Sequence, residues 1–241
     1  MITWFEYVKN PNIKRQLIKI NVGCGPNMFP HPFWTNYDHE DFGAYIEYIK
    51  NQKDPVYAKY LQDLINYVHN GGELTCIKHD LRDGFPMHED NSVDIICNLQ
   101  SIEHISPHYD CPRFLKECYR MLAPGKVLRV TTPDLDLLIN AYLSGEMDKF
   151  AIEQPEIYKQ LDPSAQLAMM MYGSSVEFRE DKYAGHKFLY TQKSITKQLN
   201  DAGFSDITFY YESGKSKHKI INDEVVDTGG FTHSMIVEAV K

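Results

Sequence analysis

The sequence predicts an α/β fold with a mostly parallel sheet, and three observations lead to this prediction. Short apolar runs of strand length alternate with longer amphipathic segments. The first apolar run, residues 17–22, leads straight into a glycine turn. Helix signals with clear start and stop residues separate several of the later runs, and parallel neighbours in a sheet need such long crossover connections.

The glycine turn and the strand after it form the first candidate ligand site. Gly23 and Gly25 let the backbone approach a ligand where a Cβ would collide, and Asp38 ends a short second strand over residues 33–37. A carboxylate at the tip of the neighbouring strand can accept hydrogen bonds from both hydroxyls of a ribose. The pattern predicts a nucleoside-cofactor site, and its alternative is a tight turn without a ligand.

The segment between the turn and Asp38 departs from a dinucleotide-binding fingerprint. Met28 stands where a third glycine is required, and three prolines leave room for at most a short helical turn. These departures, together with the pair of strands that closes the chain, argue against NAD as the cofactor. They also leave the usual contact between a helix N-terminus and the cofactor unsupported.

The central part of the chain supplies further helices and strands. An Asp-Pro pair begins a helix over residues 54–68, whose apolar side chains recur at helical spacing, and two glycines end it. Residues 74–77 and 93–97 are expected as two strands. A second helix begins at Asp110 and stops at an Ala-Pro-Gly sequence, before a fifth strand over residues 127–131.

The pattern changes after the fifth strand, because no clear strand signal follows it for a long stretch. Residues 135–190 are interpreted as an insertion with helices over residues 135–143 and 155–172, followed by a polar, aromatic segment. An insertion that follows this strand emerges on the same side of the sheet as the glycine turn. We therefore expect it to form a lid over an acceptor substrate.

The chain closes with one more helix and two strands. Thr191 caps the helix and Gly203 stops it. The strands are expected over residues 207–211 and 234–240, with a long polar loop between them. The length fits a single domain over residues 1–241 that carries the insertion.

Composition and charge limit the class of function. No apolar run approaches the roughly eighteen residues that span a bilayer, and the N-terminus has no signal-peptide pattern, so we expect a cytoplasmic protein. Five cysteines without a Cys-x-x-Cys pair fit reduced thiols. The formal net charge of −8 disfavours tight binding to a nucleic-acid backbone.

Several motifs follow one another in a fixed order. They are Ile20-Asn-Val-Gly-Cys-Gly25, His79-Asp-Leu-Arg82, Ser101-Ile-Glu-His104, Leu128-Arg-Val-Thr-Thr-Pro-Asp134 and Gly185-His186. Together they resemble the class I S-adenosylmethionine-dependent methyltransferases, and more narrowly a type 11-like subgroup with a shortened first helix. The resemblance extends over nearly the whole chain. It implies a Rossmann-like seven-stranded sheet with one antiparallel strand, helices on both faces, a helical insertion after strand five, and S-adenosyl-L-methionine as the cofactor.

The resemblance implies that two segments hold the ends of the cofactor. Gly23, Cys24 and Gly25 would pass their backbone beside the methionyl part, and Asp38 would hold the ribose.

Further cofactor contacts are implied after the third and fourth strands. Asp80 and Leu81 would contact the adenine, because a carboxylate accepts from the exocyclic amine and an apolar neighbour covers the ring. Asn98, Leu99 and Gln100 would border the sulfonium centre. The alternatives are that Asp80 caps a turn before its arginine neighbour and that Gln100 is an ordinary loop residue.

His104 is our candidate for the catalytic base. Methyl transfer from a sulfonium needs a base when the acceptor must lose a proton to become nucleophilic. A neutral imidazole with an ordinary pKa of about 6.5 can take that proton near neutral pH. Alternatively, His104 anchors its loop through hydrogen bonds. Its neighbour Glu103 is assigned to the substrate site.

The Glu103-His104 pair also resembles small-RNA 2′-O-methyltransferases, in which a Glu-x-x-Glu-His element and a later histidine bind a metal. Gln100 stands where the first glutamate of that element would be, and an amide is a poorer ligand for a hard dication than a carboxylate. We therefore expect no metal. The alternative ligand set is Glu103, His104 and His108.

The acceptor is expected to be a small molecule or a glycan precursor that is methylated on oxygen or nitrogen. His186 and Tyr190 match the subgroup's pattern and are assigned to the substrate site, whereas Arg179 and Lys182 are interpreted as exposed surface residues. One alternative is a catalytically silent cofactor-binding or regulatory protein of the same fold. Another is an RNA methyltransferase, which the acidic composition disfavours.

Overall fold

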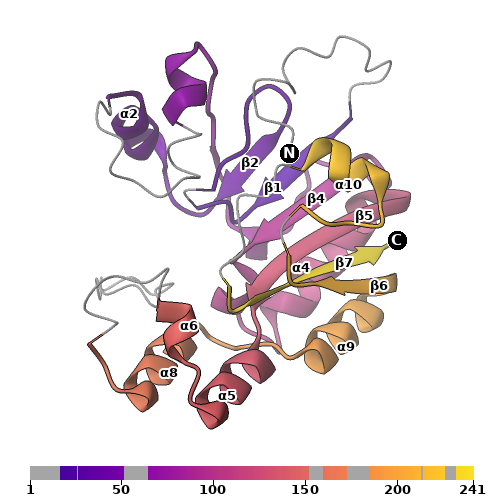
Figure 1. Ribbon diagram of the computed structural model, residues 1–241. Helices are drawn as coiled ribbons and strands as arrows, with labels where there is room; N and C mark the ends of the chain where they lie inside the picture. Colours follow the sequence, from indigo (N-terminus) through magenta and orange to yellow (C-terminus); the bar gives the residue numbers. More distant parts are fainter. Residues whose placement is uncertain are drawn as a thin grey trace.

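A seven-stranded sheet runs through the part of the chain that the computed structural model describes, residues 17–25, 27–51, 65–151, 160–172, 185–212, 214–225 and 232–241. In chain order the strands are β1 (Lys19–Val22), β2 (Thr35–Asp38), β3 (Ile77–Lys78), β4 (Val93–Leu99), β5 (Leu122–Pro133), β6 (Ser205–Tyr210) and β7 (Ser234–Val240). Across the sheet their order is β3-β2-β1-β4-β5-β7-β6 (Figure 1).

The sheet is parallel except at β7. β1 pairs in parallel with β2 and β4, and the pairs β2–β3 and β4–β5 are also parallel. β7 runs antiparallel to both β5 and β6. The expected Rossmann-like sheet with one antiparallel strand is confirmed. Strand order reverses between β1 and β4, where ligands of open α/β sheets bind outside the carboxyl ends of the strands.

Helices cover both faces of this sheet, as predicted. They are α2 (Gly43–Asn51), α4 (Asp110–Met121), α5 (Leu135–Ser144), α6 (Asp148–Ala151), α8 (Pro163–Tyr172), α9 (Gln192–Ala202) and α10 (Lys219–Glu224), with single turns η1 (Leu81–Asp83) and η2 (Ile102–His104). α4 and α9 bring Phe114, Leu115 and Ile195 against the sheet in the main core. On the opposite face, Ile221 of α10 packs in a cluster with Trp34.

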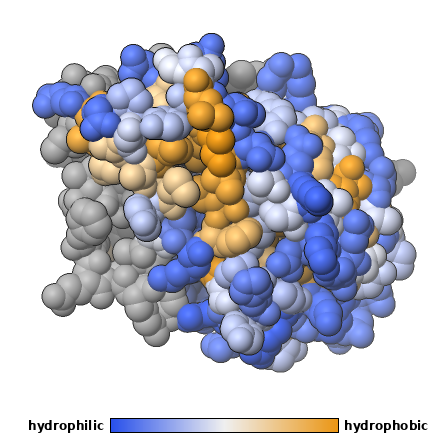
Figure 2. All heavy atoms as spheres, turned by 90° about the horizontal axis from the view of Figure 1, so that it is seen from below, coloured by the Kyte–Doolittle hydropathy of each residue, from blue (hydrophilic) through white to orange (hydrophobic). Residues whose placement is uncertain are grey.

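The helices of the predicted insertion form a small core of their own. Leu138 of α5, Phe150 of α6 and Met170 of α8 are buried together. These helices gather at one end of the molecule (Figure 1). Seen from that end, an exposed hydrophobic band crosses the surface (Figure 2). α5 and α8 carry the exposed apolar residues Leu143 and Met171.

Local sequence signals fix the ends of α9 as predicted. The Thr191 hydroxyl accepts a hydrogen bond from the Ser194 backbone N–H at 3.1 Å, and the Ser194 hydroxyl returns one to complete a capping box. Gly203 ends the helix with a φ of 107°, a left-handed conformation that glycine adopts readily.

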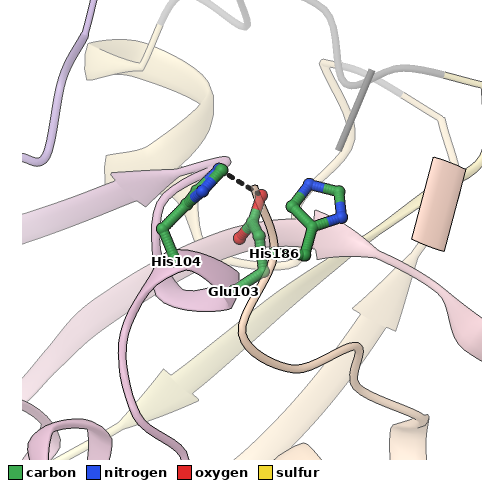
Figure 3. A group of neighbouring side chains, drawn as sticks. All are labelled: Glu103, His104 and His186. Atoms are coloured by element: carbon green, nitrogen blue, oxygen red, sulfur yellow. Dashed lines mark ion pairs between the residues drawn. The ribbon is translucent and has the colours of Figure 1, made fainter. Parts of the chain in front are cut away.

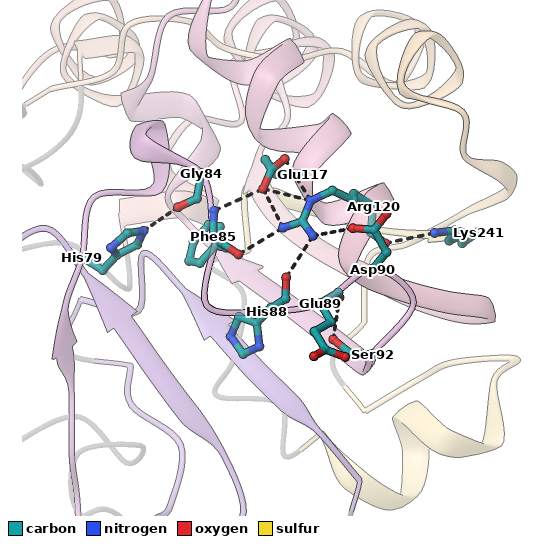
Figure 4. A network of polar contacts seen from close by, with 10 residues as sticks. All are labelled: His79, Gly84, Phe85, His88, Glu89, Asp90, Ser92, Glu117, Arg120 and Lys241. Atoms are coloured by element: carbon teal, nitrogen blue, oxygen red, sulfur yellow. Dashed lines mark hydrogen bonds and ion pairs between the residues drawn. The ribbon is translucent and has the colours of Figure 1, made fainter.

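The loop between η1 and β4 is tied to α4 by one arginine (Figure 4). Arg120 donates to the carbonyls of Phe85 and His88 at 3.0 and 2.9 Å, and it pairs with Asp90 at 2.7 Å. Its hydrogen bonds to Glu117 hold the pKa of that carboxyl below its ordinary value. This network fixes the chain that leads from η1 into the central strand β4.

Several predicted boundaries are wrong where tertiary pairing overrides local signals. β5 begins at Leu122, so the Ala-Pro-Gly sequence predicted as a helix stop lies inside a strand. Leu122 pairs with Val93, and the strand therefore starts as soon as α4 ends. The third strand covers only Ile77–Lys78, because Leu74 packs in a separate cluster with Met28.

Three of the described α-helices were not predicted. α6 lies between the two helices predicted for the insertion. α2 follows the second strand, and α10 lies within the segment predicted as a polar loop. Ile221 of α10 is 2% exposed, so burial against the sheet stabilises a helix that its sequence signals only weakly.

Some predictions fall partly outside the described residues. The helix predicted over residues 54–68 is described only from Ile65. The second helix predicted for the insertion is described only from residue 160, and there the helix begins later than predicted, at Pro163. Arg179 and Lys182 lie outside the described residues.

All five cysteines are free in the structure, and the Sγ atoms of Cys24 and Cys76 are 3.6 Å apart. In the described part of the chain, none of the helices has the length and apolar character needed to span a membrane.

Candidate active site

The glycine turn closes β1 against β2 and against the loop after β4. The backbone N–H groups of Gly23 and Cys24 both donate to the Tyr37 carbonyl, at 2.8 and 3.1 Å. Gly23 has a φ of 63°, and a Cβ added there would lie 2.0 Å from the Ser101 hydroxyl oxygen. Only glycine therefore fits at this position, and Ser101 is a neighbour of the turn that no sequence signal indicates.

Asp38 ends β2, as the sequence predicts, and its carboxylate faces the glycine turn. Its Oδ2 accepts from the Gly25 backbone N–H at 2.8 Å, and its Oδ1 accepts from the Glu40 backbone N–H at 3.0 Å. The His39 ring lies 3.0 Å from Oδ1. The side chain is buried and its orientation is fixed, and Oδ2, which has one donor, keeps capacity for another.

The three residues that end β4 point in different directions. The Asn98 amide donates to the Val22 carbonyl at 2.8 Å, while its Oδ1 is buried without a partner among the described residues. Leu99 packs in the apolar cluster on the opposite face of the sheet. Gln100, with a φ of 54°, donates to the Ser234 hydroxyl at 2.8 Å. Of the three predicted cofactor residues, Asn98 alone has a side chain next to the glycine turn.

Asp80 and Leu81 are placed where their side chains already have partners. Asp80 caps η1 by accepting from the Arg82 backbone N–H at 3.0 Å, and it forms an ion pair with the Arg82 guanidinium. The hydrogen bonds to Arg82 lower the pKa of the Asp80 carboxyl. Leu81 is 8% exposed and belongs to the main core. The turn-cap alternative for Asp80 is thus what the structure shows, and the adenine contact stays a prediction.

Glu103, His104 and His186 come together beyond the end of β4 (Figure 3). One nitrogen or oxygen atom from each side chain lies within 4.8 Å of the others. The two imidazole rings have centroids 5.0 Å apart, and His104 Nε2 is 4.0 Å from Glu103 Oε1. The structure therefore unites three predicted site residues from two distant segments.

Backbone hydrogen bonds hold these two segments together. The Glu103 carbonyl accepts from the backbone N–H groups of Lys187 and Phe188, at 2.7 and 3.2 Å. His104 Nδ1 lies 3.1 Å from the Gly185 carbonyl oxygen. Because a carbonyl can only accept, Nδ1 carries the proton, and Nε2 is the acceptor nitrogen of the neutral ring.

Burial shifts the titration of two members of this cluster. Glu103 is 1% exposed, and desolvation raises its pKa to about 8, an effect that the nearby Thr132 hydroxyl partly offsets. Desolvation, aided by the neighbouring His104, lowers the pKa of His186 to about 4. Both groups are thus held in their neutral forms at neutral pH in the absence of a bound cation.

Two other predicted residues lie apart from this cluster. Tyr190 is fully buried in the main core, where its hydroxyl neighbours Cys111 and burial raises its pKa. A direct contact of Tyr190 with an acceptor stays a prediction. His108 is exposed and is not a member of the group formed by Glu103, His104 and His186.

Comparison with known proteins gives consistent findings. A family model described as a methyltransferase domain matches residues 20–208. A curated Mycolicibacterium smegmatis protein named "Probable S-adenosylmethionine-dependent methyltransferase" is 47% identical over 45 residues. That match spans 19% of this chain and 16% of the relative, far less than the relative's whole length.

Two solved structures are similar over most of the chain. A SAM dependent methyltransferase from Archaeoglobus fulgidus has 14% identity and a TM-score of 0.47, with 93% of this chain and 86% of that chain covered. An S-adenosylmethionine dependent methyltransferase from Mesorhizobium loti has 12% identity and a TM-score of 0.45, with coverage of 94% and 91%.

Proposed function

Because the chain belongs to the S-adenosylmethionine-dependent methyltransferase family, we propose that it methylates an oxygen or nitrogen of a small molecule or glycan precursor. One observation carries this proposal. The carboxylate of Asp38 stands at the carboxyl end of β2 beside the glycine turn, and the cluster of Glu103, His104 and His186 lies beyond the carboxyl end of β4, with β1 between the two strands. These positions support a cofactor side and an acceptor side on either side of the point where strand order reverses.

The residues at the turn fit the cofactor that the family uses. A Cβ built on Gly25 would have no neighbour within 4 Å, so this part of the turn leaves room for a ligand. Asp38 is already oriented to accept from ribose hydroxyls, and the unpartnered Asn98 Oδ1 can accept from a donor on the methionyl part. We assign these contacts, with the backbone of residues 23–25, to S-adenosylmethionine.

When bound, S-adenosylmethionine supplies a methyl group on a sulfonium sulfur, which departs as a neutral thioether. The chain's own task is to orient the acceptor, exclude water and receive a proton. His104 Nε2 is the nitrogen we assign as the base, because Nδ1 donates to the Gly185 carbonyl and the side chain is 33% exposed. An acceptor hydroxyl or amine can therefore reach it.

The charge of the acceptor side favours a small uncharged acceptor. Burial keeps Glu103 and His186 neutral near pH 7. These residues can therefore form hydrogen bonds with an acceptor, but they do not attract a polyanion electrostatically. The net charge of −8 acts in the same direction against an RNA substrate.

Residues 135–190 are proposed as the acceptor lid. Their last part, which contains His186, is joined to the Glu103 backbone, and their helices share one small core. A lid joined to the cluster in this way would cover the acceptor while it reacts.

Calorimetry and a turnover assay test the proposal together. Titration with S-adenosylmethionine and with its demethylated product measures cofactor binding. A coupled assay over sugars, nucleotide sugars and small phenols then measures methyl transfer. We expect binding and turnover with one of these acceptor classes.

Variants separate the base from the cofactor site. His104→Ala is expected to bind the cofactor normally and to lose about 10²- to 10⁴-fold in kcat. His108→Ala, a nearby exposed histidine, should leave both values unchanged. Near wild-type turnover by His104→Ala would exclude the base role, whereas cofactor binding without turnover on any acceptor would favour a silent regulatory protein.

A further inference from the structure

The side chains of Glu103, His104 and His186 are placed like the ligands of a metal ion. Their ligand atoms lie within 4.8 Å of one another, and Figure 3 shows the three side chains converging. A tetrahedral ion with ligands at about 2.1 Å holds its ligand atoms about 3.4 Å apart. Small rotations of the side chains, with shifts of about 1 Å, are enough to reach that spacing.

Glu103 is the strongest evidence for a missing partner. It is 1% exposed, and neither carboxylate oxygen makes a hydrogen bond of good geometry among the described residues, where the Thr132 hydroxyl and the His104 ring are its polar neighbours. Buried carboxylates are almost always paired or bound to a metal, because leaving them without a partner costs several kcal/mol. The neighbouring N–H groups of Lys187 and Phe188 cannot help, since both donate to the Glu103 carbonyl.

The backbone lies beside both imidazoles and orients that of His104. The Gly185 carbonyl accepts from His104 Nδ1, which turns Nε2 toward the Glu103 carboxylate. The backbone of Met170 and Met171 lies beside the His186 ring and acts to raise its pKa, and its Nδ1 is buried without a partner in the described part of the chain. Metal-binding histidines are held in this way, with the second nitrogen bonded to a carbonyl or carboxylate.

We propose that Glu103, His104 and His186 form a binding site for a divalent transition-metal ion of the Zn²⁺ class. Two imidazoles and one carboxylate suit Zn²⁺, Co²⁺ or Fe²⁺ better than Mg²⁺ or Ca²⁺, which take mainly oxygen ligands. Three protein ligands leave at least one position open, the arrangement of catalytic and not of structural zinc sites.

The chemical role of the ion rests on the proposed methyltransferase function, whereas the binding of the ion does not. With an ion bound, an acceptor hydroxyl at the open position would lose its proton more easily, and its oxygen would bond to the methyl carbon as the carbon–sulfur bond breaks. The proton goes to solvent. His104 is a ligand in the ion-loaded protein, so its role as a base applies to the ion-free protein.

Metal binding is tested without any acceptor. Elemental analysis of the purified chain comes first, followed by calorimetric titration of the chelator-treated protein with Zn²⁺. Titration with Co²⁺ adds visible absorption bands that report nitrogen and oxygen ligands. One ion per chain is expected, with both readouts saturating at the same ratio.

Matched histidine variants locate the site. His186→Asn and His104→Asn are expected to weaken Zn²⁺ binding by about tenfold or more and to change the Co²⁺ spectrum. His108→Ala should bind as the wild type does. Thermal unfolding and cofactor titration of each variant show that it is folded.

Two results would overturn the site. One is that the wild type binds Zn²⁺ no better than His186→Asn, and the other is that His108→Ala loses binding as well. If the protein transfers methyl groups but binds no metal ion, the proposed metal site is wrong and the proposed function stands. Metal binding without turnover on any acceptor would instead remove the proposed function.

Discussion

The two sides of the candidate site differ in how their buried carboxylates are satisfied. Asp38 and Glu103 are 5% and 1% exposed, so burial is nearly the same. Asp38 accepts from two backbone N–H groups and lies beside a histidine. Glu103 has no hydrogen-bond partner among the described residues. The Asp38 carboxylate is therefore satisfied by backbone donors of the chain, whereas the Glu103 carboxyl has the Thr132 hydroxyl and the His104 ring near it.

The cause of this difference lies in the backbone. The glycine turn has a left-handed conformation that directs the Gly25 N–H at the Asp38 carboxylate. Near Glu103 the available N–H groups, those of Lys187 and Phe188, are used to join two segments of the chain. Backbone N–H groups thus orient the Asp38 carboxylate on the cofactor side, whereas on the acceptor side they join residues 187 and 188 to the Glu103 carbonyl.

The largest effect is expected from Glu103→Gln in chelator-treated protein. The pKa of Glu103 rises from 4.5 to about 8 on folding, so the carboxyl stays protonated in the folded chain while it ionises in the unfolded chain. Stability is therefore lost as pH rises from about 4.5 to about 8. Relative to the wild type, the variant should gain up to about 5 kcal/mol between pH 4 and pH 9.

Urea unfolding across that pH range measures this gain. Thr132→Val serves as a control that removes a neighbouring hydroxyl and keeps the carboxyl. Parallel stability curves for the wild type and Glu103→Gln would mean that Glu103 has a partner, and the contrast with Asp38 would disappear.

Gly23→Ala should disturb the cofactor side and lower the free energy of unfolding by about 3 kcal/mol. The added Cβ would lie 2.0 Å from the Ser101 hydroxyl oxygen, at a φ of 63° that disfavours alanine. Gly125→Ala is the matched control, because its φ is 75° and nothing lies within 4 Å of the new Cβ. Thermal unfolding and cofactor titration compare the two variants, and equal losses would show that strain and not the contact with Ser101 decides the effect.

Asp38→Asn should weaken cofactor binding by about tenfold and lower stability by about 1–2 kcal/mol. Either orientation of the amide places an NH₂ group against a backbone N–H, at Gly25 or at Glu40. Asp41→Asn controls for charge, since Asp41 lies in the same loop, is exposed and accepts from Gly43. If both variants bind the cofactor equally well, Asp38 is not the ribose contact.

The smallest effect, about 1 kcal/mol, is expected for Gln100→Ala. Its amide donates to the Ser234 hydroxyl, a contact between β4 and β7 that belongs to neither side of the site. Chemical denaturation should show this loss while cofactor affinity stays constant. A fall in affinity of tenfold or more would return Gln100 to the sulfonium centre, where the resemblance first assigned it.

Much of the fold could be predicted because its signals are local. The capping box at Thr191, the glycine turn and the alternation of strands and helices each depend on a few neighbouring residues. The early start of β5 at Leu122 and the helix α10 could not, because strand pairing and the burial of Ile221 decide them.

The candidate site divides in the same way. Gly25 and Asp38 lie next to each other because neighbouring parallel strands place them there, and the sequence order of the two strands is enough to expect it. The partners of Leu99 and Tyr190 were not foreseen, since each depends on the packing of remote segments. The cap that Asp80 forms before Arg82 was foreseen as an alternative, because it is local.

The sequence by itself determined the family, the order of the elements and the cofactor turn, because these follow from local conformational preferences and motif spacing. Only the tertiary structure decided that His186, and not His108, joins Glu103 and His104. Residues 185–188 return from the insertion and hydrogen-bond to η2, and that contact buries Glu103 beside two imidazoles. This burial raises the pKa of Glu103 through desolvation. Desolvation depends on where the chain folds back and not on the residues next to Glu103 in the sequence.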